Sequence, residues 1–121
     1  KLTIRQTPPS VTCTAAPNSL WPPDGKPDPV TVSGIITPGT QAIPADGATF
    51  AVIDEYGLDQ PHGSFTIGAG GNYSFTVPLI AERKGNDFDG RTYTINVSAT
   101  DNIGKVGVCS IVVTVPHDQG N

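Results

Sequence analysis

Hydrophobic and polar side chains alternate along two stretches of the chain, residues 73–79 and 92–99. A period of two places every second side chain on the same face, which is the pattern of a strand with one buried face. No stretch shows the i, i+3, i+4 spacing of an amphipathic helix. Five further segments have strand-like composition: 11–15, 30–37, 48–55, 63–67 and 106–115. The pattern therefore predicts an all-β chain of about seven short strands.

Glycine and proline separate these segments, with 14 and 12 copies respectively. Turns are predicted at residues 38–39 and 101–104, and a hairpin loop at the glycine-rich residues 68–72. Residues 16–29 contain five prolines. Because proline cannot donate to an inner ladder, we expect this segment to run in extended form over one end of the fold. Short strands divided in this way are typical of two packed sheets with Greek-key connections.

The length of 121 residues corresponds to one domain. We assign residues 11–116 to the sandwich, residues 1–10 to a linker or leading strand, and residues 117–121 to a C-terminal tail or linker. The chain opens at Lys1 without a methionine, so we expect it to be part of a longer polypeptide.

The charge pattern argues against nucleic acid as a partner, and the distribution of apolar residues argues against membrane insertion. The net charge is −4 with a pI near 4.8, and the seven basic residues form no cluster. Nucleic acid is therefore not an expected partner, since phosphate binding requires clustered Lys and Arg. No apolar run approaches the roughly 20 residues that span a bilayer, so membrane insertion is not expected either.

Four segments resemble those of immunoglobulin-like domains. Asp89 precedes Tyr93 by four residues at the entry to the penultimate predicted strand, which resembles a tyrosine corner. Position 95, two residues after that tyrosine, is Ile95 and not the cysteine of antibody domains. Residues 98–105, Ser-Ala-Thr-Asp-Asn-Ile-Gly-Lys, are similar to the turn before the last strand in bacterial immunoglobulin-like, hyalin-repeat-like and PKD-like modules. Residues 20–26 and 116–120 also look like signatures of such modules.

The resemblance implies an immunoglobulin-like Greek-key sandwich that serves as an accessory module of a secreted or cell-surface bacterial protein. Its expected role is structural, as a spacer or an interaction module, and its expected partners are neighbouring domains of the same polypeptide or a surface protein. In such sandwiches the first and last strands run side by side. Cys13 and Cys109, the two cysteines of the chain, lie in those strands and are predicted to form a disulfide. Two buried thiols in a reducing compartment are the alternative.

The acidic segment around residue 88 is a candidate calcium site. Asn86, Asp87 and Asp89 place carboxylate and amide oxygens close together, and Asp101 adds another if the two loops meet. In the alternative, Asp89 serves the tyrosine corner and Arg91 pairs with Asp87 or Asp101. Calcium is the only cofactor that the sequence suggests.

Aromatic residues offer an alternative function, carbohydrate binding. The rings of Trp21 and Tyr56 could stack on sugar faces, which would make a polysaccharide the partner. In the alternative, Trp21 closes the end of the sandwich.

We expect no catalytic activity. His62 and His117 are predicted surface-loop residues, too few for a zinc site, and no nucleophile motif accompanies them. Asp54 and Glu55 are adjacent in a predicted strand and turn, so their carboxylates point to opposite faces and cannot flank one glycosidic bond.

Overall fold

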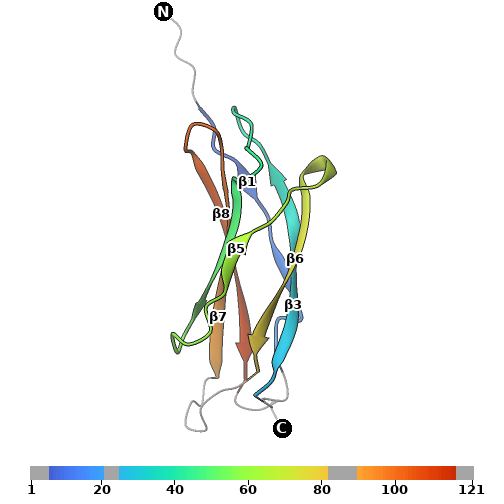
Figure 1. The fold of residues 1–121 in the computed structure, drawn as a ribbon, viewed down its shortest axis with the longest axis vertical. Helices are drawn as coiled ribbons and strands as arrows, with labels where there is room; N and C mark the ends of the chain where they lie inside the picture. Colours follow the sequence, from blue (N-terminus) through green and yellow to red (C-terminus); the bar gives the residue numbers. More distant parts are fainter. Residues whose placement is uncertain (1–5, 21–24, 82–89, 117–121) are drawn as a thin grey trace, which may run out of the picture.

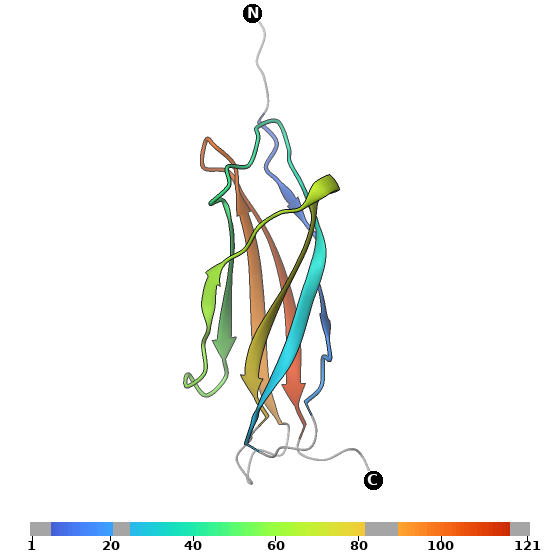
Figure 2. The same ribbon diagram turned by 45° about the vertical axis from the view of Figure 1, so that its right-hand side comes forward.

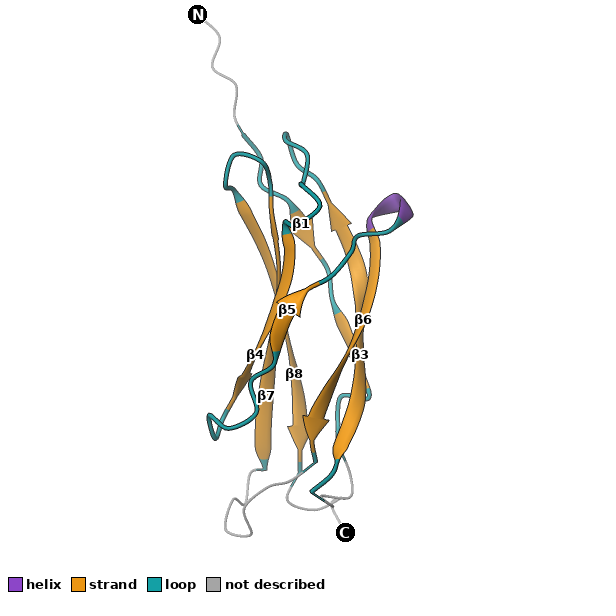
Figure 3. Ribbon diagram, viewed as in Figure 1, coloured by secondary structure: helices purple, strands orange, loops and turns teal. Residues whose placement is uncertain are grey.

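The computed structural model describes residues 6–20, 25–81 and 90–116, which form two antiparallel sheets facing each other (Figures 1 and 3). The elements, in chain order, are β1 (Ser10–Val11), β2 (Thr14–Ala16), β3 (Pro27–Thr37), β4 (Ala48–Asp54), β5 (His62–Ser64), the single 3₁₀ turn η1 (Ala69–Gly71), β6 (Asn72–Ile80), β7 (Arg91–Thr100) and β8 (Val106–Val115). The predicted all-β class and two-sheet sandwich are confirmed.

Each sheet contains four strands. In the first sheet, β3 pairs with β6 on one side and with the short strands β1 and β2 on the other. In the second sheet the order is β5-β4-β7-β8. The chain therefore passes from one sheet to the other between β3 and β4, between β5 and β6, and between β6 and β7.

The core lies between the sheets and confirms the predicted alternation. Along β7, every second residue from Arg91 to Ala99 is buried, while the residues between them are partly exposed. In β6, Tyr73, Val77 and Leu79 are buried. Phe50, Phe65 and Phe75 are half-buried and stack with ring centroids 4.6–4.8 Å apart, so aromatic rings fill the space between β4, β5 and β6.

The proline-rich segment differs from its prediction at its C-terminal end, because β3 begins at Pro27 and not at residue 30. Pro29 lies directly opposite Pro78 of β6. Neither residue has an N–H, so the two can face each other only at a non-hydrogen-bonded position of the ladder. On its other side, β3 pairs with β2 only from Thr31 onward. Pro27 and Pro29 therefore face no strand there that would need an N–H donor from them.

Residues 68–72 do not form the predicted hairpin. β5 pairs with β4 and β6 pairs with β3, so this connection crosses between the sheets. Position 71 requires glycine, because the φ of Gly71 is 84° and a Cβ there would lie 2.2 Å from the carbonyl oxygen of Ile36. The predicted loop position of His62 is also wrong: it lies in β5 opposite Ala51, although it is exposed as expected.

The two ends of the described chain lie at opposite ends of the sandwich (Figures 1 and 2). The carbonyl of Pro9, which precedes β1, packs against Gly107 near the start of β8. Pro116 follows the last residue of the same strand. The ten residues of β8 span about 30 Å, so the polypeptide enters at one end of the molecule and leaves at the other.

Candidate functional site

A disulfide joins Cys13 to Cys109, as predicted, with an S–S distance of 1.97 Å and a Cα–Cα distance of 6.0 Å. Cys13 lies between β1 and β2 at the margin of the first sheet, and Cys109 lies in β8 at the margin of the second. Both residues are half-buried, and Cys13 packs against the core. The bond therefore links the two sheets along one side of the sandwich.

A buried ion pair lies at the opposite end of the second sheet from the β7–β8 turn. The guanidinium of Arg91 donates to both carboxylate oxygens of Asp54, from Nε to Oδ1 at 2.9 Å and from an Nη to Oδ2 at 2.5 Å. The two residues are 2% and 4% exposed. The alternative in which Arg91 pairs with Asp101 is wrong, because Asp101 lies at the other end of β7. Asp87, its other candidate partner, lies outside the described residues. The register of β4 against β7, with Asp54 opposite Tyr93, places the Asp54 carboxylate beside the guanidinium.

Asp54 also organises the turn that follows β4. Its carboxylate accepts the backbone N–H groups of Tyr56, Leu58 and Asp59 at 3.0, 3.0 and 2.8 Å. Burial by itself raises the pKa of Asp54, but the hydrogen bonds from Arg91 and from the three N–H groups outweigh it and hold the pKa well below its usual value. The carboxylate of Asp59 in turn accepts the N–H of Ile80 at 3.0 Å, which ties this turn to the end of β6.

The Arg91 guanidinium lies between two aromatic rings. Its central carbon is 4.5 Å from the ring centroid of Tyr56 and 4.8 Å from that of Tyr93. The hydrogen bonds to Asp54 raise the pKa of Arg91 above its usual value, so the side chain is a permanent buried cation. Tyr56, a predicted sugar-binding residue, thus has one face of its ring covered by Arg91. The second predicted residue, Trp21, lies outside the described residues.

Tyr93 anchors the start of β7 to the end of β6. Its hydroxyl donates to the carbonyl oxygen of Ile80 at 2.8 Å, and burial raises the pKa of this hydroxyl. A tyrosine corner requires a backbone partner a few residues upstream, whereas Ile80 lies 13 residues upstream, so this contact is not itself that corner. Asp89, the other predicted member of the corner, lies outside the described residues.

Replacing Tyr93 by phenylalanine should lower the free energy of unfolding by about 1–3 kcal/mol, because the partly buried Ile80 carbonyl loses its donor. Urea denaturation would measure the change. Tyr73→Phe is the matched variant, since the Tyr73 hydroxyl donates to the carbonyl of Thr12 at 2.5 Å, seven residues along β6 from Ile80. The two sites are separate, so the losses should add in the double variant; no loss in Tyr93→Phe would contradict the anchoring role.

Asp101 lies in the turn between β7 and β8 and is 3% exposed. Its Oδ1 accepts the N–H groups of Ile103 and Lys105 at 3.0 and 2.9 Å. The ten-residue strand β7 separates Asp101 from Gly90 by about 30 Å, whereas the four residues from Asn86 to Gly90 reach at most about 14 Å. Asp101 therefore lies too far away to share a cation with Asn86, Asp87 or Asp89, which lie outside the described residues.

The described residues contain no group of three or more His, Cys, Asp or Glu that could hold a metal ion. His62 has no such cluster around it, and His117 lies outside the described residues. Glu55 is exposed, and its carboxylate accepts the N–H of Thr92 at 3.0 Å, whereas the neighbouring Asp54 is buried. The two carboxylates thus have separate surroundings, as the strand alternation predicts.

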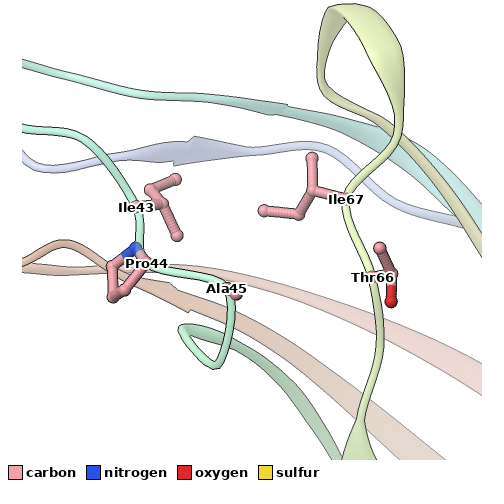
Figure 4. Close-up of a pocket in the computed structure, with 5 residues that line it drawn as sticks. All are labelled: Ile43, Pro44, Ala45, Thr66 and Ile67. Atoms are coloured by element: carbon pink, nitrogen blue, oxygen red, sulfur yellow. The ribbon is translucent and has the colours of Figure 1, made fainter.

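A pocket of about 210 Å³ lies between the segment before β4 and the segment after β5 (Figure 4). It is lined by Ile43, Pro44, Ala45, Thr66 and Ile67, and the side chains of Ile43 and Ile67 point toward each other across it. Ligand pockets generally have volumes of about 300–1,000 Å³ and contain polar groups that orient the ligand. This pocket is smaller, and Thr66 is its one side chain with a polar group.

The ion pair was missed at the sequence level, although the sequence contained a signal for it. By the alternation of the strands, Asp54 falls on the same face as Phe50 and Val52. Arg91 falls on the same face as Tyr93 and Ile95 in the strand that begins near residue 92. Opposite charges on two inward faces predict a buried pair, since a buried charge requires a partner.

No family model matches the chain, and no curated protein matches it. Within the described ranges, the structure contains no helix long and apolar enough to cross a membrane.

Proposed function

We propose that this chain is a non-catalytic, immunoglobulin-like spacer module of a larger secreted or cell-surface bacterial protein. The strand order supports the immunoglobulin-like topology, because three connections pass between the two sheets. The position of Tyr93 near the start of the penultimate strand supports it as well, since immunoglobulin-type domains have their corner tyrosine there. In this proposal the protein acts by position, holding its neighbours a fixed distance apart.

The observation that carries the proposal is the opposite placement of the two described chain ends. A module that is entered near Pro9 and left at Pro116 holds the preceding and following domains at opposite ends of a rigid sandwich. Rigidity follows from the ladders of 10 registered pairs between β7 and β8 and nine between β3 and β6. Such a unit adds its own length to a chain of domains.

The disulfide supports the extracellular location that we propose. Disulfides persist in secreted and surface proteins and are rare in a reducing cytosol. The Cys13–Cys109 bond joins the first and last parts of the sandwich, so export to an oxidising compartment would complete the fold.

The spacer function can be tested on two copies joined head to tail. Small-angle X-ray scattering should give a maximum dimension close to twice that of a single copy. A dimension near that of one copy would mean that the two fold back on each other, and it would contradict the spacer function.

Affinity electrophoresis in soluble polysaccharides tests the competing function. A spacer should migrate unretarded across a broad panel of glycans. Retardation that is lost in Trp21→Ala, in a variant with unchanged melting temperature, would replace the spacer proposal by a carbohydrate-binding module.

A further inference from the structure

The first and last segments of the domain run in the same direction along one side of the molecule. β1 and β2 are antiparallel to β3, and Ser19 forms a parallel bridge with Thr114 of β8. Thr114 also donates to the carbonyl of Asn18 at 3.1 Å and accepts from the N–H of Leu20 at 2.8 Å. The segment that contains Cys13 and the strand that contains Cys109 are thus parallel neighbours, joined by the disulfide.

We infer that the Cys13–Cys109 bond is a covalent load path, which carries tension across the module and keeps most of the chain out of that path. A force between the chain ends enters through the residues before Cys13 and reaches the disulfide. It crosses to β8 over a Cα–Cα distance of 6.0 Å and continues in the same direction to Val115. This inference rests on the proposed spacer function, because only a module within a chain of domains is pulled from both ends.

The residues between the two cysteines form a covalently closed loop. They number 95, one fewer than the sequence separation of 96. This loop contains β2 to β7 entirely and the start of β8. Tension between the chain ends cannot extend the loop while the disulfide is intact, because its two ends are held together. Only the 12 residues before Cys13 and the 12 after Cys109 can be drawn out.

The two loaded segments are held by contacts that resist a pull along the strand. From Cys109 to Val115, β8 has seven registered pairs with β7. Antiparallel ladder bonds are perpendicular to the strands, so a pull along β8 loads all of them together. On the other side of the disulfide, the N–H of Thr12 donates to the Ile35 carbonyl at 2.9 Å, and the N–H of Ile35 donates to Thr12 Oγ1 at 2.9 Å. These contacts hold the segment that leads into Cys13.

The lengths that this load path permits are measurable. An extended residue contributes about 3.6 Å, so the 24 residues outside the loop can contribute about 85 Å of contour length. Opening the disulfide adds the loop of 95 residues, or about 340 Å. The oxidised and reduced forms therefore differ several-fold in extensibility.

Single-molecule force spectroscopy on the full chain, placed between marker domains of known unfolding length, tests the inference. The oxidised protein should give no extension longer than about 85 Å of contour length, and dithiothreitol should make a further extension of about 340 Å accessible. In that step the dithiol is oxidised to its own disulfide as the Cys13–Cys109 bond is reduced to two thiols. Longer extensions from the oxidised chain would overturn the inference.

Two variants complete the experiment. Cys13→Ser/Cys109→Ser should extend fully without reductant. Thr14→Ser/Val108→Ser places serine beside each cysteine, preserves the hydroxyl at position 14 and the disulfide, and should behave as the wild type.

If the double cysteine variant does not fold, the wild type can be held at constant force until the segments outside the loop are extended and then exposed to dithiothreitol. A second step of about 340 Å supports the load path, and its absence contradicts it. The scattering test of spacing is independent, so failure of the spacer function and failure of the load path give different results.

Discussion

Removing the disulfide is expected to lower the free energy of unfolding by about 4–5 kcal/mol. The Cys13–Cys109 bond closes a loop with a sequence separation of 96, and a loop of this size strongly restricts the unfolded chain. Domains of this size are stable by roughly 5–15 kcal/mol, so the loss is a large share of the total. Urea denaturation with and without dithiothreitol would measure it as a shift of the midpoint.

The variant Cys13→Ser/Cys109→Ser separates the effect of the bond from other effects of the reductant. It should be less stable than the oxidised wild type, and its midpoint should not change with dithiothreitol. An equal midpoint for the oxidised and reduced wild type would show that the bond does not stabilise the fold. It would also remove the physical basis for an exported, disulfide-dependent module.

Replacing Asp54 by alanine is expected to destabilise the domain by about 3–5 kcal/mol, because it removes the carboxylate that accepts two hydrogen bonds from the buried Arg91 guanidinium. It also removes the acceptor for three backbone N–H groups in the turn after β4. Arg91→Ala should disturb this turn less, since the Asp54 carboxylate remains and still accepts those three N–H groups. Urea denaturation of both single variants and the double variant forms a thermodynamic cycle. The coupling free energy between Asp54 and Arg91 should be favourable and exceed about 1 kcal/mol in magnitude, as is typical for residues in direct contact.

Acid pH should have a related effect. The pKa of Asp54 is lower in the folded protein than in the unfolded chain, so the unfolded state binds a proton more readily. The stability that depends on the ionised carboxylate is therefore complete above the unfolded pKa of about 4 and decreases as the pH falls toward the folded pKa. Asp54→Asn should show a shallower decrease in stability than the wild type between pH 5 and 2.

Glu55→Ala is the control for both measurements. Glu55 is adjacent to Asp54 but exposed, and its carboxylate contacts the backbone and hydroxyl of Thr92 at the surface. Its loss should change the stability by less than about 1 kcal/mol. A cost for Asp54→Ala no larger than that for Glu55→Ala would show that the buried pair does not stabilise the fold.

Most of the strand positions could be predicted from the sequence because burial of one face imposes a period of two. The alternation at residues 92–99 predicts which side chains of β7 lie in the core, and the structure buries Tyr93, Ile95, Val97 and Ala99 completely. The pairing of Cys13 with Cys109 was also predicted, since the two cysteines lie in the first and last predicted strands.

The errors occurred where pairing between distant strands decided the outcome. The glycine-rich residues 68–72 have the composition of a hairpin, but the strands that they connect belong to different sheets. Pro27 and Pro29 disfavour a central strand, yet β3 accommodates them because β2 does not extend that far. Local composition contains no information on which strands are neighbours.

The sequence by itself determined the all-β class, the inward faces of the strands and the presence of two cysteines able to join its ends, because each depends on local periodicity or on residue type. Only the tertiary structure decided that Arg91 pairs with Asp54 beside two tyrosine rings, and that the disulfide links two segments that run parallel to each other. Both features depend on which distant segments become neighbours, and burial of the whole set of inward faces, more than any single motif, selects those neighbours.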